Sequence, residues 1–142
     1  MTINQLSIFI ENRSGTLIKV LNLLKKAEIQ IIASTIADTA EYGIYRLICS
    51  EPGRAYDVLK DAGVAVAKSE VFALELDNKP GRAADAIEIF SNADISIAYM
   101  YTFLIDGKGI LIFRTDNAEK AKEVILNNKL KYIEEDKLQE LD

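Results

Sequence analysis

The stretch that decides the fold is ENRSG, residues 11–15, which lies between an alternating run, LSIFI, and a helical run, TLIKVLNLLKKA. A second stretch of the same kind, DNKPG at residues 77–81, occupies an equivalent junction. Each stretch has an acid, an asparagine, a cation and a final glycine. A tight turn needs the glycine, because glycine enters left-handed backbone conformations without a steric penalty. It needs neither the asparagine nor the cation, so both junctions are candidates for binding.

The two junctions belong to a duplication. A shift of 66 residues, which places Gly15 on Gly81, overlays the sequence on itself without a gap. The pairs of identical residues in this register include Asn12 and Asn78, Ala27 and Ala93, Ile29 and Ile95, Ile31 and Ile97, Gly43 and Gly109, Ile44 and Ile110, Ala55 and Ala121, and Val58 and Val124. One register over this length predicts two copies of one module. We place them at residues 1–68 and 69–142, with residues 67–69 as the short link between them.

Hydrophobic periodicity predicts the same element order in each copy. In copy one the predicted elements are a strand at 5–11, a helix after Gly15, strands at 29–37 and 43–49, a helix from Pro52 and a strand that starts with VAVA. In copy two they are a strand at 70–77, a helix at 81–92, strands at 94–104 and 109–115, a helix at 117–128 and a short strand near 130–134. This order, βαββαβ, predicts an α+β fold, the ferredoxin-like sandwich, duplicated in tandem. The acidic tail, EEDKLQELD, is expected to be a solvated last turn.

The composition excludes several classes of function. The formal net charge is −5, and the lysines are interspersed with acids, which disfavours nucleic acid because phosphate binding needs a basic patch. No apolar run approaches the roughly 20 residues that cross a bilayer, so no membrane partner is expected. The N-terminus lacks the features of a signal peptide, and Cys49 is the single cysteine. Both features favour the reducing cytoplasm.

Catalysis finds little support in the residue types. The chain has no histidine, which removes the commonest general base and the commonest metal ligand. Neither a metal-ligand cluster nor a phosphate-binding loop of the G-x-x-x-x-G-K type is present. We therefore expect no enzyme, no metal and no cofactor. The enzymatic alternative is a small acylphosphatase-like hydrolase that would use Asn12 and Arg13.

The junctions have the chemistry of a site for a small zwitterion. A strand that turns directly into a helix leaves backbone N–H groups unpaired at the positive end of the helix dipole, where they can bind an anion. The carboxamides of Asn12 and Asn78 can accept from an ammonium or donate to a carboxylate. Arg13 and Lys79 add positive charge. The alternative is that the asparagine only caps the helix and that the cation is only solvated.

The motifs ENRSGTL and DNKPGRA resemble the signature of ACT domains, which are small regulatory modules with the βαββαβ fold. The resemblance spans nearly the whole chain and implies a stand-alone protein of two tandem ACT domains, without an attached enzyme domain. It further implies that an amino acid or a similar carboxylate binds between ACT modules paired side by side. The ligand-binding residues that the turn motif implies are Asn12, Arg13, Ser14, Gly15, Thr16 and Leu17 in copy one, and Asn78, Lys79, Pro80, Gly81, Arg82 and Ala83 in copy two.

Comparison with the serine-sensing ACT members adds two positions and one departure. In those members a polar residue at the opening of the second strand also holds the ligand, and the matching residues here are Gln30 and Ser96. The same members have a histidine two residues before the turn asparagine, whereas this chain has Ile10 and Leu76, which counts against serine. The resemblance therefore leaves the ligand open. Gln30 and Ser96 could instead face solvent at the start of their strands.

The strand at 94–104 is apolar on both faces, with Tyr99, Tyr101 and Phe103 on one face and Met100, Thr102 and Leu104 on the other. The helices of this fold cover only one face of the sheet, so the second face is expected to pack against another sheet or chain. We therefore expect a homo-oligomer, most simply a dimer, and possible docking on a separate metabolic enzyme or regulator. A module that only recruits a protein partner, with no ligand, is the main alternative. An RNA-stacking platform is disfavoured by the acidic balance.

Overall fold

The computed structural model describes residues 1–11, 14–38 and 42–140, and it divides into two compact units. The copy-one unit comprises Asn4–Ser69 with Leu138–Asp142, and the copy-two unit comprises Met1–Ile3 with Glu70–Lys137. The element order confirms the predicted fold class, the ferredoxin-like sandwich in two copies. Each unit is described separately below.

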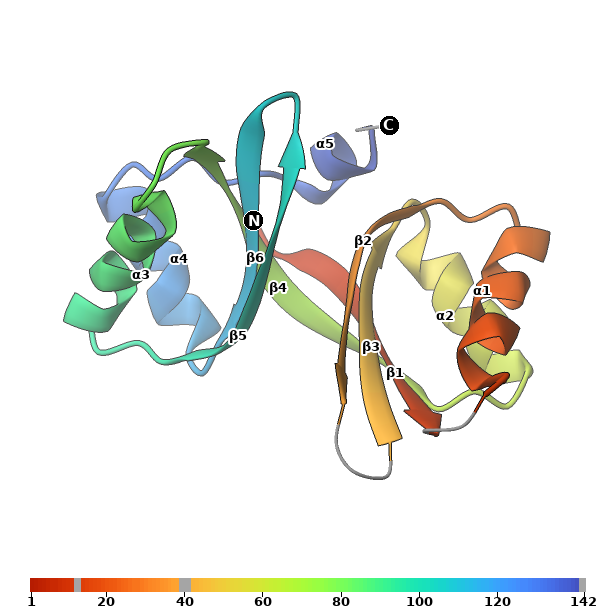
Figure 1. Cartoon of the computed structure of the whole chain (residues 1–142). Helices are drawn as coiled ribbons and strands as arrows, with labels where there is room; N and C mark the ends of the chain where they lie inside the picture. The colour runs from red at the N-terminus through yellow and green to blue at the C-terminus, as the bar shows by residue number, and fades with distance from the viewer. Residues whose placement is uncertain (12–13, 39–41, 141–142) are drawn as a thin grey trace. The chain divides into compact units, whose positions relative to one another are not determined.

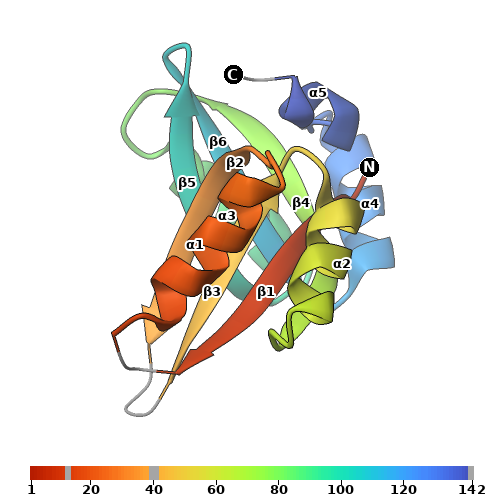
Figure 2. The same cartoon turned by 90° about the vertical axis from the view of Figure 1, so that its right-hand side faces the viewer.

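The copy-one unit is an antiparallel sheet with two helices on one face (Figures 1 and 2). Its elements are β1 (Ile3–Glu11), α1 (Thr16–Lys26), β2 (Ile31–Asp38), β3 (Tyr42–Cys49), α2 (Pro52–Asp61) and the first residues of β4 (Val66–Asp77). The strand order is β2-β3-β1-β4. The helices α1 and α2 contact each other, and their apolar stripes bury Leu24 and Leu59 against Leu6, Ile8 and Leu47 of the sheet.

The copy-two unit repeats this arrangement, and its two long helices, α3 and α4, also lie on one face of the sheet (Figure 1). It contains the rest of β4, then α3 (Arg82–Asn92), β5 (Ile97–Ile105), β6 (Lys108–Thr115), α4 (Ala118–Asn127) and the first residues of α5 (Glu135–Gln139). The strand order is β4-β6-β5. Phe113 is the centre of the core: its ring centroid lies 5.5 Å from that of Phe72 and 5.0 Å from that of Phe90. All three rings are fully buried.

Three predicted details differ from the structure. Residues 67–69 do not form a link, because they lie inside the continuous strand β4. The short strand near 130–134 is reduced to a bridge between Leu74 and Tyr132, with a hydrogen bond of 2.9 Å from the N–H of Ile133 to the carbonyl of Ala73. The tail is not fully solvated, since Leu138 of α5 is completely buried.

The strands β2 and β5 begin two and three residues later than predicted, because the preceding helices end in a Schellman motif. After α1, Glu28 is left-handed (φ 56°), and the N–H of Ile29 donates to the carbonyl of Leu24 over 3.0 Å. The residues that follow therefore complete the helix end before the strand can start. The same six-residue bond closes α2, α3 and α4, with Gly63, Asp94 and Lys129 in the left-handed position.

Candidate functional site

The turn of copy one is described in part. Asn12 and Arg13 lie outside the described residues. Gly15 is left-handed with φ 94°, as the turn requires, and both it and Ser14 are exposed. The hydroxyl of Thr16 donates to the carbonyl of Glu11 over 2.7 Å and so ties the start of α1 to the end of β1. Leu17 packs against the copy-one core rather than toward solvent.

The turn of copy two is described completely and leaves the start of α3 open. The N–H of Lys79 donates to the carbonyl of Asp77 over 2.9 Å, and Pro80 and Gly81 follow, with Gly81 left-handed at φ 88°. The N–H of Asp85 makes the first helical bond, to the carbonyl of Gly81. Within the described chain no side chain caps this helix. The N–H of Arg82 donates to the carbonyl of Lys79 over 3.4 Å. The N–H groups of Ala83 and Ala84 have no partner in the described chain and remain donors at the positive end of the helix dipole.

The charges around this turn divide into a paired cation and an unpaired one. The guanidinium of Arg82 lies 3.3 Å from the carboxylate of Asp85 and 3.9 Å from that of Asp77. These pairs are exposed and contribute little to stability. The side chains of Asn78 and Lys79 form neither a hydrogen bond nor an ion pair with any other residue in the described ranges. An amide and an ammonium are thus available to a ligand.

An open pocket of about 270 Å³ lies beside this turn. It brings together four of the residues predicted from the motif: Asn78, Lys79, Arg82 and Ala83. Its other lining residues are Leu76, Asp77, Thr102, Phe103, Leu104 and Gly109. Ligand pockets for drug-sized molecules span about 300–1,000 Å³, so the volume suits a smaller metabolite. One side of the pocket is polar, at the turn, and the other side is formed by the strands.

The strand side of the pocket is a row across three strands. Leu76 of β4 is paired with Gly109 of β6, and Gly109 is paired with Leu104 of β5. Paired residues of antiparallel strands point to the same face, so the two leucines flank a position without a side chain. The face is the one that carries Leu74 and Leu111, which belong to the helix-covered core. The row therefore forms an apolar floor next to the start of α3.

The six lining residues outside the predicted set were missed for a physical reason. Asp77 is the first residue of the motif DNKPG, and Leu76 directly precedes it, but neither was named as a ligand residue. Thr102, Phe103 and Leu104 belong to no motif and become neighbours of the turn only through the strand register. Gly109 did give a signal, because it recurs as Gly43 in the duplication. A glycine inside a strand weakens the strand and often marks a place where a ligand or another backbone comes close. A glycine at this position in both copies is therefore a signal that the sequence alone provides.

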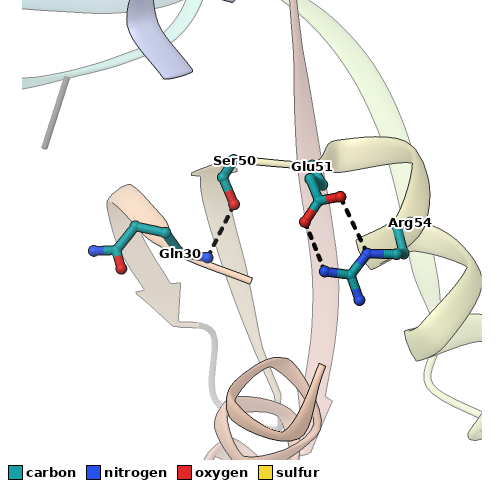
Figure 3. Close-up of polar contacts among 4 residues, drawn as sticks. All are labelled: Gln30, Ser50, Glu51 and Arg54. Atoms are coloured by element: carbon teal, nitrogen blue, oxygen red, sulfur yellow. Dashed lines mark hydrogen bonds and ion pairs between the residues drawn. The ribbon is translucent and has the colours of Figure 1, made fainter. Parts of the chain in front are cut away.

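Gln30 and Ser96 take equivalent positions in the two copies, and neither lines this pocket. Both are exposed, and the backbone of each makes hydrogen bonds next to the start of its strand, as Figure 3 shows for Gln30. The N–H of Gln30 donates to Oγ of Ser50 over 3.0 Å, and the N–H of Ser50 donates back to the carbonyl of Gln30 over 2.9 Å. In copy two a carboxylate oxygen of Asp116 replaces the hydroxyl and accepts from the N–H of Ser96 over 3.1 Å.

The residues that follow Ser50 and Asp116 are Glu51 and Asn117, and each directly precedes a helix. Glu51 precedes α2, and its carboxylate accepts two hydrogen bonds from the guanidinium of Arg54, over 2.6 and 3.2 Å (Figure 3). This hydrogen bonding lowers the pKa of Glu51 below its ordinary value and raises that of Arg54. The equivalent residue of copy two, Asn117, instead caps α4 by accepting from the N–H of Lys120 over 3.1 Å. Glu51 and Asn117 therefore make their hydrogen bonds at the starts of α2 and α4, and neither lines the pocket.

The edge strand β5 alternates as predicted. Tyr99, Tyr101 and Phe103 are half-buried, whereas Met100 and Leu104 are 48 % and 62 % exposed. The register places the exposed pair on the face that carries the helices, since Met100 is paired with the core residue Phe113. In the described ranges no group of three or more His, Cys, Asp or Glu side chains could hold a metal ion. No helix in the same ranges is long and apolar enough to span a membrane.

Comparisons with known proteins agree with this architecture. A family model described as an ACT domain pair matches residues 1–142. A protein of known crystal structure from Bacteroides thetaiotaomicron is 36 % identical, with a TM-score of 0.94 over 99 % of this chain and 98 % of that one. The regulatory subunit of aspartate kinase from Thermus thermophilus is 14 % identical, with a TM-score of 0.63 over 87 % of this chain and 91 % of that one. No curated protein sequence matches the chain.

Proposed function

The chain belongs to the ACT domain family, and from that premise we propose that it is a regulatory protein that binds an amino acid in the pocket beside α3. The family is regulatory rather than catalytic. The observation that carries the proposal is the pocket itself, which joins Asn78, Lys79, Arg82 and Ala83 of the turn motif to an apolar floor. An α-amino acid has the matching parts: two opposite charges on one carbon and a side chain that points away from them.

The polar end of the pocket fits the α-carbon substituents of such a ligand. The carboxylate would accept from the N–H groups at the start of α3 and lie near the ammonium of Lys79. The ligand's ammonium would donate to the carboxylate of Asp77 and to Oδ1 of Asn78. Asn78 is the sharpest test of this arrangement, because its exposed side chain makes no hydrogen bond that its removal would break within the described chain.

The experiment is a thermal-shift screen of the twenty amino acids, followed by calorimetric titration of those that bind. A ligand at about 100 times its Kd stabilises the folded state by about 2.7 kcal/mol, which is a visible shift. We expect Asn78→Ala to weaken binding by about tenfold or more, since a hydrogen bond to a charged group contributes about 1.5–3 kcal/mol. The melting temperature without ligand should stay unchanged.

The matched control is Asn127→Ala, which removes an exposed carboxamide from α4, away from the pocket. It should bind every amino acid as the wild type does. Equal binding by Asn78→Ala and the wild type would contradict the proposed site. If none of the twenty amino acids binds the wild type, the ligand-free interaction module becomes the better account.

The further properties of the protein are also proposals. We expect a homodimer, which is supported by the exposed Met100 and Leu104 on the edge strand β5 and is open to sedimentation analysis. A regulatory role would follow if the amino acid bound the two association states unequally, because a ligand shifts an equilibrium only by that difference. The cytoplasm remains the expected location. Release of phosphate from acetyl phosphate would instead favour the hydrolase.

A further inference from the structure

Gly109 is a glycine that neither the backbone nor the packing requires. The left-handed glycines are Gly15, Gly63, Gly81 and Gly107, and Gly109 is not one of them. It lies within β6, where a glycine weakens the strand because it orders the most flexible backbone and packs no side chain. A glycine inside a strand can also mark a place where a ligand approaches the backbone closely.

Space is available at this position. A Cβ atom built on Gly109 would meet the carbonyl oxygen of Leu76 at 3.6 Å and the Cβ of Leu76 at 3.8 Å, which are ordinary van der Waals distances. The fold would accept an alanine there. The added methyl group would instead occupy the pocket, because Gly109 is one of its lining residues.

The equivalent glycine of copy one also has room for a Cβ and an ordinary backbone conformation. Gly43 lies in β3, is not left-handed, and is paired with Ile10 on one side and Asp38 on the other. A Cβ there would meet its nearest atoms, which belong to Ala37 and Ile36, at 3.6 Å. Both copies thus place a glycine in the middle strand of a row of three paired residues.

We infer that Gly109 determines which ligands the pocket accepts, by leaving room over β6 for the ligand's side chain. The inference rests on the proposed function: with the α-carboxylate and ammonium at the turn, the side chain extends over Gly109 between Leu76 and Leu104. The ligand class is an α-amino acid with an aliphatic side chain. An aliphatic side chain would cover apolar surface of the two leucines, whereas a charged side chain would find no partner in that row.

The experiment measures the affinities of glycine, L-alanine, L-valine and L-leucine for the wild type, Gly109→Ala and Gly109→Val by calorimetric titration. The wild type should prefer the larger side chains. Gly109→Ala should lower the ratio of leucine to alanine affinity at least tenfold, and Gly109→Val should extend the loss to valine. Gly53→Ala is the control, because Gly53 lies on α2 with no atom within 4 Å of an added Cβ, and its affinities should match those of the wild type.

Each outcome decides a different claim. Circular dichroism and the melting temperature establish that the variants fold. Gly109→Ala is the variant most certain to fold, because an added Cβ at this position meets its nearest atoms at ordinary van der Waals distances. An unchanged ratio in folded Gly109→Ala, or an equal loss of all four ligands, overturns the size role of Gly109. If only charged or polar amino acids bind the wild type in the screen of all twenty, the aliphatic class is overturned and the proposed function stays intact. Binding of no amino acid at all overturns both.

Discussion

Single residues at equivalent positions of the two copies have taken different partners. Glu51 and Asn117 both precede a helix, yet Glu51 binds the side chain of Arg54, whereas Asn117 binds the backbone of Lys120. The duplication placed a polar residue at the same position in both copies, but the residue that each one binds depends on the side chains around it. At this scale the sequence predicts a helix start but not the hydrogen-bond partner.

The pair of Glu51 and Arg54 makes a prediction about pH. Hydrogen bonding to Arg54 lowers the pKa of Glu51 from the ordinary 4.5, so the folded state holds its charged form more strongly than the unfolded state does. The pair's contribution to stability is therefore present above pH 4.5 and is lost as the pH falls through the lowered value. In Arg54→Gln the pKa of Glu51, measured by NMR titration, should rise toward 4.5.

The matched control for this titration is Lys60→Gln, which removes a cation from the same helix at a position that does not bind Glu51. It should leave the pKa of Glu51 lowered. The account of the pair is wrong if Arg54→Gln also leaves that pKa where it is in the wild type.

At the scale of the element, the helices and strands were predictable and their junctions were less so. Apolar spacing located every helix from α1 to α4, because burial of one face produces that spacing. The starts of β2 and β5 were missed because Glu28 and Asp94, rather than glycines, take the left-handed position that ends the helix. The sequence carries no glycine signal there, whereas Gly63 marks the end of α2 correctly.

The backbone conformations of Gly63 and Gly53 differ, although both glycines are exposed, and they predict opposite effects of substitution by alanine. Gly63→Ala should destabilise the protein by about 1 kcal/mol, because the left-handed conformation costs an L-residue about 1–2 kcal/mol. Gly53→Ala should leave the stability unchanged or raise it by up to about 1 kcal/mol, because Gly53 is helical and alanine favours the helix. Urea unfolding of both variants measures the difference. Equal destabilisation by the two substitutions would contradict the role of the left-handed position.

At the scale of the whole molecule, the 66-residue repeat made the fold predictable from one sequence, because two copies of a pattern are harder to misread than one. The candidate site was predictable on its polar side, where Asn78 and Lys79 follow from the turn motif. Its apolar side was not, because the row of Leu76, Gly109 and Leu104 exists only once three strands are in register. A motif records neighbours in sequence, whereas a pocket needs neighbours in space.

The central claim is that an amino acid binds at the turn before α3, and an NMR titration of backbone amides tests it most directly. With each of the twenty amino acids added in turn to the ¹⁵N-labelled protein, at least one should shift the amide resonances of residues 76–79, 82, 83, 104 and 109 more than those elsewhere. These amides surround the pocket, so a bound ligand changes their surroundings first. The claim is contradicted if no amino acid shifts them, or if the shifts fall only at other sites.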